Sequence, residues 1–390
     1  MKFYKKIEKF LDNRFDRIKI LFFKHVERKK FKDKRRKAIY SKISLSKEQK
    51  RKIDVLYKNN YGKKIPYKWH KHYTAFTGSF DEKYFPELIY IPEFEHFMNY
   101  NRRYTAVFAD KNVLPFIAKA AGVKTPTIFV SSSKGVITIE ESVVDIKTAI
   151  EKIKDLGDAF IKPSTDSSSG NGCCLVKFKN GIDVLSGESA EEVFKKAGKN
   201  FVIQEVIKCD KGISAIHPES VNTFRVMTYI WKNSIEKVPT IMRIGVGDSV
   251  VDNAHKGGIF IAVEDDGTLH KTAFTEFNKK FYSHPNTGIV FDGYKIQGFE
   301  KVVAAAKKMH SLIPQVGAIN WDFTLNEANE PVLIEANMNS GGIWVFEMAH
   351  GKGAFGDKTA EILRWMKSVR KMSKSKRQNY LYGKLPDGEL

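Results

Sequence analysis

The 390-residue sequence contains only three cysteines and no long apolar run. Cys173 and Cys174 are adjacent and Cys209 stands alone, so neither zinc-ligand spacing nor a disulfide framework is present. So few cysteines are typical of a reducing compartment. The first residues lack the apolar core of a signal peptide, and IKILFF at 18–23 is too short to span a bilayer. The sequence therefore predicts a cytoplasmic protein.

Acidic residues are scarce at the N-terminus. Residues 1–72 hold 26 Lys and Arg against 7 Asp and Glu, which is +19 of the net charge of +21. Within residues 1–37, apolar side chains recur every three to four positions among the basic ones, which predicts a basic amphipathic helix. Such a helix can pack on the protein's own body, lie on an anionic membrane surface or contact an anionic glycan. Nucleic acid is the least favoured partner, because no aromatic-basic repeat accompanies the charge.

Regular alternation of strands and helices is also missing. Residues 40–105 have poor periodicity and predict short helices and loops, whereas the chain from residue 201 onward predicts mostly antiparallel strands. The expected fold class is therefore α+β. Helices are expected over 110–121, 143–156, 189–198, 299–313 and 361–369, and strands over 125–130, 158–164, 173–178, 201–207, 222–231, 239–247 and 258–264.

The stretch GAINWDFTLNEANEPVLIEANMNSGG, residues 317–342, predicts a tight hairpin. With NEANEP as the connection, Leu325 pairs near Val332 and Asp322 falls opposite Glu335. Because side chains alternate along a strand, Glu335 and Asn337 share one face. Two carboxylates and an amide oxygen suit Mg²⁺ that also binds waters and phosphate oxygens. Taken alone, the same residues also fit a solvated sheet surface.

Two further stretches carry groups suited to phosphate chemistry. In IKPSTDSSSGNGCC (161–174), Lys162 precedes a Ser and Gly loop whose backbone N–H groups can hold phosphates, although no Walker A motif is present. In MRIGVGDSVVDNAHKGG (242–258), Arg243, Asn253 and His255 precede a glycine pair and suit a phosphoryl-bearing intermediate. Each stretch alone is also compatible with an ordinary surface turn.

Together, and in this order, these stretches over about residues 105–370 resemble the ATP-grasp superfamily. The resemblance is nearest to its sugar-transfer-associated group. Lys111 in FADKNVL and Lys162 are similar to the two ATP-binding lysines, and Asp322, Glu335 and Asn337 keep the D-x12-E-x-N spacing of the magnesium ligands. The run NAHKGG is similar to a segment of ribosomal-protein glutamate ligases, with Arg243 upstream as in those enzymes.

The resemblance implies a set of site residues. The implied catalytic residues are Arg243, Asn253, His255 and Arg225. The implied Mg²⁺ ligands are Asp322, Glu335 and Asn337, and two Mg²⁺ ions are expected. The implied ATP-binding residues are Lys111, Lys162, Ser167, Ser168, Ser169, Gly170, Asn171, Gly172, Gln204, Glu205, Val206, Ile207 and Asp210, the last as ribose partner.

The resemblance also implies an architecture, in which two α+β subdomains hold ATP between them. The expected divisions are a basic, largely helical N-terminal extension (1–72), a substrate-side segment (73–110), an ATP-grasp N-subdomain with the glycine-rich loop (111–205), a C-subdomain with the metal-binding hairpin (206–376) and a tail (377–390).

The implied activity is an ATP-dependent carboxylate–amine ligase that forms an amide through an acyl-phosphate. Its expected substrates are a carboxylated sugar and an amine or amino acid, in synthesis of a cell-surface polysaccharide such as a capsule. Residues 1–37 would then contact an anionic glycan or the inner face of the membrane. A small-molecule kinase on the same fold and a nucleic-acid-binding protein are the alternatives.

Overall fold

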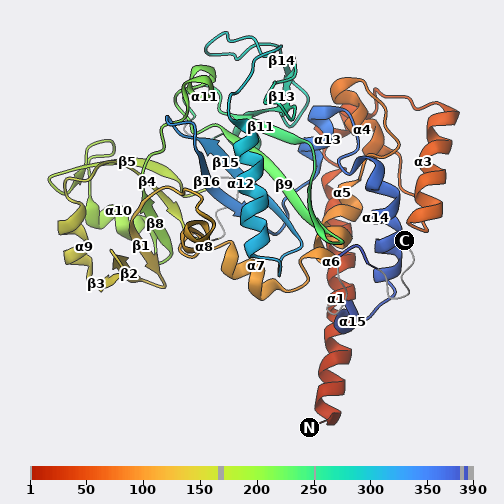
Figure 1. The fold of residues 1–390 in the computed structure, drawn as a ribbon, viewed down its shortest axis with the longest axis horizontal. Helices are drawn as coiled ribbons and strands as arrows, with labels where there is room; N and C mark the ends of the chain where they lie inside the picture. Colours follow the sequence, from red (N-terminus) through yellow and green to blue (C-terminus); the bar gives the residue numbers. More distant parts are fainter. Residues whose placement is uncertain (1, 166–170, 250–251, 378–381, 385–390) are drawn as a thin grey trace.

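The structure is a computed structural model, and it describes all residues except 1, 166–170, 250–251, 378–381 and 385–390. Figure 1 shows one sheet at the left, a second sheet in the centre, and N-terminal and C-terminal helices together at the right. Both sheets are built from antiparallel strand pairs, so the α+β prediction is confirmed.

The first sheet has the strand order β3-β2-β1-β8-β4-β5-β6-β7. Helices α9 and α10 pack on it, and apolar side chains such as Ile153 and Phe194 fill the space between. Helix α10 starts at a capping box in which Ser189 and Glu192 each bond the other's backbone N–H. The bounds are β1 Ile128–Ser133, β2 Val136–Ile139, β3 Ser142–Val144, α9 Ile146–Ile153, β4 Gly157–Pro163, β5 Cys174–Lys179, β6 Ile182–Asp183, β7 Glu188–Ser189, α10 Ala190–Ala197 and β8 Phe201–Gln204.

The second sheet has the order β14-β13-β12-β11-β9-β15-β16, and β10 pairs with β9. On one face, alternate residues of β9 such as Phe224 and Val226 pack with helices α8 and α12. The bounds are α8 Leu114–Ala121, α11 Lys211–Ile216, β9 Thr223–Trp231, β10 Ser234–Lys237, β11 Thr240–Ile244, β12 Ile259–Val263, β13 Ala273–Phe274, β14 Lys280–Phe281, α12 Phe299–Leu312, β15 Ala318–Leu325 and β16 Pro331–Asn337, with a 3-10 turn at Ala254–Lys256.

The opposite face of the second sheet is covered by the N-terminal extension and the last helices. The intervening residues of β9, Met227 and Tyr229, pack there with aromatic side chains such as Tyr90 and Phe94. The bounds are α1 Lys2–Lys30, α2 Lys34–Tyr40, α3 Lys47–Asn60, α4 Lys68–Thr77, α5 Glu87–Ile89, a π-helix Tyr90–Glu95, α6 His96–Met98, α7 Arg102–Phe108, α13 Trp344–His350, a 3-10 turn Gly356–Lys358, α14 Thr359–Val369 and α15 Lys374–Arg377.

Helix α1 extends away from the body at its N-terminal end (Figure 1). The predicted helix over 1–37 is interrupted, because Asp33 accepts a hydrogen bond from the Arg35 backbone N–H and starts α2. None of the helices in the described part of the chain is both long and apolar enough to cross a membrane.

Several predicted boundaries were wrong by a few residues. The helix expected over 143–156 begins only after Asp145, whose side chain accepts a hydrogen bond from Thr148 N, and residues 142–144 form β3 instead. The strand expected over 201–207 ends at Gln204. The helix expected over 110–121 begins at Leu114.

Candidate active site

A cavity of about 660 Å³ lies between the two sheets. The first sheet lines it with residues such as Lys162 on β4 and Gln204 on β8, and the second with residues from β9, β11, β15 and β16. Most residues predicted to bind ATP, metal or substrate line this cavity, namely Lys111, Lys162, Gln204, Glu205, Val206, Ile207, Arg225, Arg243, Asn253, His255, Asp322, Glu335 and Asn337.

The β15–β16 hairpin places Asp322 opposite Glu335, as predicted. Leu325, predicted to pair near Val332, pairs with the preceding residue, Pro331. A β-bulge at Ile334 adds one residue to β16 and restores the expected pairing beyond it. Asn337 Nδ2 donates to Asp322 Oδ2 at 3.0 Å, which leaves the amide oxygen of Asn337 available to a cation.

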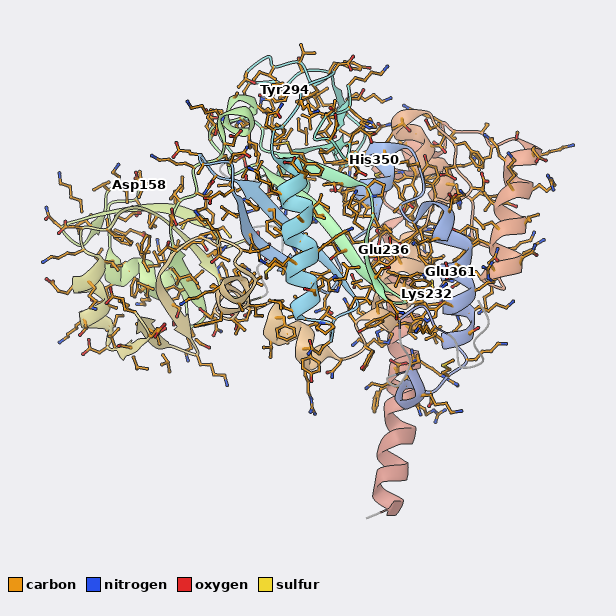
Figure 2. The ribbon with its side chains drawn as sticks, in the orientation of Figure 1. Asp158, Lys232, Glu236, Tyr294, His350 and Glu361 are labelled. Carbon is orange, nitrogen blue, oxygen red and sulfur yellow. The ribbon has the colours of Figure 1, made fainter. Side chains whose placement is uncertain are left out.

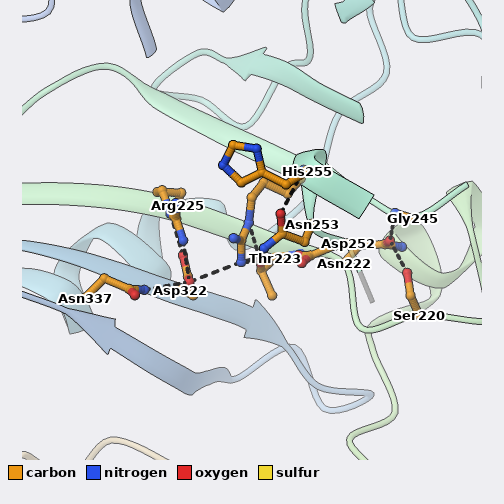
Figure 3. A network of polar contacts seen from close by, with 11 residues as sticks. Ser220, Asn222, Thr223, Arg225, Gly245, Asp252, Asn253, His255, Asp322 and Asn337 are labelled. Atoms are coloured by element: carbon orange, nitrogen blue, oxygen red, sulfur yellow. Dashed lines mark hydrogen bonds and ion pairs between the residues drawn. The ribbon is translucent and has the colours of Figure 1, made fainter. Parts of the chain in front are cut away.

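Two arginines converge on the buried carboxylate of Asp322 (Figure 3). Arg225 donates from Nε at 2.9 Å and from Nη2 at 2.8 Å, and Arg243 Nη2 lies 3.1 Å from Oδ2. Burial alone would raise the pKa of Asp322, but the two guanidinium groups outweigh it and hold that pKa below its usual value. Asp322 therefore stays ionised in the interior.

Two lysines lie beside the hairpin. Lys111 Nζ is 2.9 Å from Glu335 Oε1, and Lys162 Nζ donates to the carbonyl of the bulged Ile334 at 3.5 Å. Burial, and next the charge of Lys111, lower the pKa of Lys162 to about 8. Two cations held together in a buried site favour a polyanion such as a triphosphate.

Asp252 is a buried residue of this site that sequence reasoning missed. Its Oδ2 accepts a hydrogen bond from Thr223 N at 3.0 Å and another from the Thr223 hydroxyl, while Oδ1 lies 3.4 Å from Arg243 Nη2. Thr223 Oγ1 also accepts from Arg243 Nη2 at 2.9 Å. Asp252 therefore fixes Arg243, and its place directly before NAHKGG is the only sequence signal for it.

His255 connects the cavity to the N-terminal extension. Its Nδ1 lies 2.7 Å from Glu276 Oε2, and Glu276 Oε1 accepts from Arg36 Nη2 at 2.7 Å. His255 also lines a second cavity of about 540 Å³, together with Lys29, Lys30, Asp33, Arg35, Arg36 and Glu276. The extension thus reaches the edge of the first cavity.

The remaining predicted residues lie elsewhere. Ser167, Ser168, Ser169 and Gly170 fall outside the described residues. Asn171 and Gly172 are described but do not line the cavity, whereas the neighbouring Cys173 does. Asp210 starts α11 by accepting a hydrogen bond from Gly212 N at 2.8 Å, and it does not line the cavity either.

Comparison with known proteins gives one family match. The family model described as "Sugar-transfer associated ATP-grasp" matches residues 92–362. No curated protein matches the chain.

Solved structures similar to the chain include several ligases and synthetases. VanG D-Ala:D-Ser ligase from Enterococcus faecalis is 12% identical, with a TM-score of 0.40, over 67% of this chain and 62% of that one. An L-amino acid ligase from Bacillus licheniformis is 13% identical, with a TM-score of 0.36, over 66% and 48%. N5-carboxyaminoimidazole synthetase from Staphylococcus aureus complexed with ADP is 13% identical, with a TM-score of 0.36, over 62% and 50%. The chain spans about half the length of most of these structures.

Proposed function

The chain belongs to the sugar-transfer-associated ATP-grasp family, and from this membership we propose that it is an ATP-dependent carboxylate–amine ligase. One observation carries the proposal. A single cavity holds two lysines on one side and two carboxylates with an amide on an adjacent hairpin. This combination suits a metal–triphosphate complex, because the lysines offset phosphate charge while oxygen ligands bind the cation.

Asp322, Glu335 and Asn337 fit Mg²⁺. All three offer oxygen atoms from adjacent strands, and the Asn337 amide uses its N–H group to bond Asp322, which leaves its oxygen as the atom that would bind a cation. Mg²⁺ bound there would neutralise charge on the β- and γ-phosphates of ATP. Lys111 and Lys162 would fix the same phosphates, and Gln204 to Ile207 would hold the adenine.

We assign Arg243 to the transferring phosphoryl group. The acceptor carboxylate would attack the γ-phosphorus of ATP and give an acyl-phosphate and ADP, and an amine would then displace phosphate to form the amide. Arg243 and Asn253 line the cavity and offer N–H donors to the phosphoryl oxygens and to the later oxyanion. Asp252 and Thr223 hold the Arg243 guanidinium before substrate arrives, so little reorganisation is needed.

We place the acceptor in the second cavity, on the far side of His255. Four cations of the extension, Lys29, Lys30, Arg35 and Arg36, outnumber the acids Asp33 and Glu276 there. A net positive lining favours an anionic substrate, which supports a carboxylated sugar as acceptor.

The extension also has a surface suited to an anionic membrane. Phe15, Ile18, Leu21 and Phe22 recur at helical spacing on α1 and are 59–64% exposed. Arg14 and Arg17 are exposed on the same helix. An exposed apolar stripe beside cations binds the surface of bilayers that contain anionic lipid.

A screen for ADP release tests the activity. Amino acids and amines are combined with glucuronic acid, galacturonic acid or their nucleotide sugars, with ATP and Mg²⁺, and products are weighed by mass spectrometry. A ligase needs both substrates and releases phosphate, and its product gains the mass of the amine less water. A product that retains phosphate and needs no amine would instead make the protein a kinase.

Variants of the extension test the acceptor and membrane contacts. Lys29→Ala with Lys30→Ala should raise the acceptor KM and leave the ATP KM unchanged. The control pair Lys47→Ala with Lys52→Ala, at two exposed cations of α3, should change neither KM.

Phe15→Ser with Leu21→Ser should reduce co-sedimentation with phosphatidylserine vesicles. The control pair Val143→Ser with Leu185→Ser, at exposed apolar sites elsewhere, should not reduce it. Deleting residues 1–37 is a poorer test, because Phe31 is part of the core.

A further inference from the structure

A group of metal-binding side chains lies outside the cavity that we assign to ATP. One carboxylate oxygen of Glu264 and one ring nitrogen each of His270 and His350 all lie within 4.8 Å of one another. None of the three residues lines the cavity of the candidate active site. Figure 2 labels His350 above the central strands, near the end of α13.

The fold brings two of these residues together through a short turn. Val263 and Leu269 pair as antiparallel neighbours, and His270 N donates to Ala262 O at 3.0 Å. Glu264 and His270 therefore stand diagonally across the turn on one face, and His270 Nε2 lies 2.5 Å from Glu264 Oε1. Both side chains are partly exposed, so a cation can enter from solvent.

An ion pair between Glu264 and His270 would explain two of the three side chains, but it does not explain the unpaired ring nitrogen of His350. Its Nε2 is 2.7 Å from the Thr240 carbonyl, so this nitrogen carries the proton and donates it. Its Nδ1 is buried and has no hydrogen-bond partner in the described structure. A histidine that donates one N–H to a backbone carbonyl and leaves the other nitrogen as a bare acceptor is prepared for a metal ion.

The charge nearest in sequence to His350 is that of Lys352, two positions later. Lys352 opposes a cation electrostatically, but its charge can move into solvent on a long side chain.

We propose that Glu264, His270 and His350 form a Zn²⁺ site that fastens the turn after β12 to the end of α13. Two imidazoles and one carboxylate with an open position suit Zn²⁺, whereas Mg²⁺ prefers oxygen ligands alone, so the two metals are directed to different sites. Helix α13 begins at Trp344, whose ring lies 6.1 Å from that of His255. The Zn²⁺ site therefore holds a helix that starts beside the candidate active site.

Calorimetric titration of the full, EDTA-treated chain with ZnCl₂ tests the site without ATP. The expected result is about one Zn²⁺ bound per chain. The affinity for Zn²⁺ should fall at least ~10-fold in His350→Ala and in His270→Ala, because changing even a residue that only supports a metal ligand typically lowers affinity by that factor or more. His25→Ala, which removes an exposed histidine of α1, should bind like the unchanged protein. Zn²⁺ should also raise the unfolding temperature of the unchanged protein more than that of His350→Ala.

Two further variants keep the test decisive. Glu264→Gln alters an exposed side chain and serves if His350→Ala does not fold, as judged by circular dichroism. Cys174→Ser removes one of two adjacent thiols that can also capture Zn²⁺, and it should retain the site. Absence of Zn²⁺ binding by the unchanged protein, equal binding by His350→Ala and His25→Ala, or loss of binding only in Cys174→Ser would overturn the proposal. Failure of the proposed ligase activity would not affect this result.

Discussion

The Arg225 guanidinium forms a two-point ion pair with the Asp322 carboxylate, at 2.9 and 2.8 Å, inside the protein. Arg243 approaches the same carboxylate at 3.1 Å. Glu335, on the neighbouring strand, is different, because its side chain is 30% exposed and pairs with Lys111. The two carboxylates assigned to metal binding therefore have different structural roles, and their variants should behave differently.

Glu335→Gln should lower turnover by at least ~10²-fold, the scale of losing one charge-stabilising group in a transition state. The substitution keeps the size of the side chain but removes a charged ligand from the expected metal site. Turnover is measured as ADP release at saturating ATP over a range of Mg²⁺ concentrations. Glu330→Gln is the matched control, because Glu330 lies on the same hairpin and pairs with Lys124 outside the cavity. Equal rates for both variants would contradict the metal assignment.

Asp322→Ala should lower the free energy of unfolding as well as the turnover. Removing this carboxylate leaves Arg225 without its buried partner and leaves Arg243 with Asp252 alone, and breaking a buried ion pair in this way costs about 3–5 kcal/mol. Glu335→Ala should cost far less, since its partner Lys111 stands beside a partly exposed position. Urea unfolding of the two variants measures the difference. Equal destabilisation would show that the arginines do not depend on Asp322.

Nucleotide affinity should fall above pH 8. The pKa of Lys162 in the free protein is about 8, and the protonated lysine is the form that attracts phosphate. Below pH 8 the affinity should therefore be constant, and above it each pH unit should weaken binding up to ~10-fold until the pKa of the bound state is reached. Titration with Mg²⁺-ADP between pH 7 and pH 9.5 measures this trend, because that range brackets the pKa of Lys162 and stays below the pKa of an ordinary lysine, about 10.4.

Lys162→Met is the control for this pH dependence. The variant should bind nucleotide weakly, and its affinity should no longer change in that pH range through this group. A pH dependence that is unchanged in Lys162→Met would assign the effect to another residue.

The part of the site that the sequence predicts depends on local geometry. Asp322, Glu335 and Asn337 could be placed on one face because strand side chains alternate and a short turn fixes the pairing. The bulge at Ile334 could not be predicted, since it shifts the pairing by one residue without changing the apolar pattern. Asp322 still lies opposite Glu335, because the extra residue at Ile334 compensates for a connection between the strands that is one residue shorter than predicted.

Contacts between distant segments could not be predicted. Arg36 and Glu276 are 240 positions apart, and only packing of the extension against the second sheet brings them together. Asp252 was missed for a related reason, because its role depends on burial beside Thr223 and Arg243. The family and the α+β class, by contrast, depend on ordered motifs and strand periodicity, and both predictions were confirmed.

Asp252→Asn should lower kcat and leave the ATP KM nearly unchanged. Asp252 acts through Arg243, which it orients together with Thr223, so the loss should be smaller than that of Arg243→Ala. Arg243→Ala should itself reduce kcat more than nucleotide affinity, because in our proposal its guanidinium contacts the transferring phosphoryl group and does not hold ATP. Steady-state kinetics of both variants give the kcat and KM values. A change confined to the ATP KM would assign Arg243 to nucleotide binding.

Acid should weaken the attachment of α1 to the body by protonating Asp16. Burial opposes the charge of Asp16, but its hydrogen bond and ion pair with His96, at 2.6 Å, and its contact with Arg377 lower its pKa from 3.8 to about 2. Because the folded pKa lies below the unfolded one, the stabilisation of about 2 kcal/mol is present above pH 3.8 and is lost as the pH falls towards 2.

Urea unfolding of Asp16→Asn should therefore show reduced stability at pH 5 and a smaller loss on acidification than the unchanged protein. Asp158→Asn, at an exposed aspartate labelled in Figure 2, should follow the unchanged protein. Coincident pH profiles for Asp16→Asn and the unchanged protein would show that the contacts of Asp16 with His96 and Arg377 do not stabilise the protein.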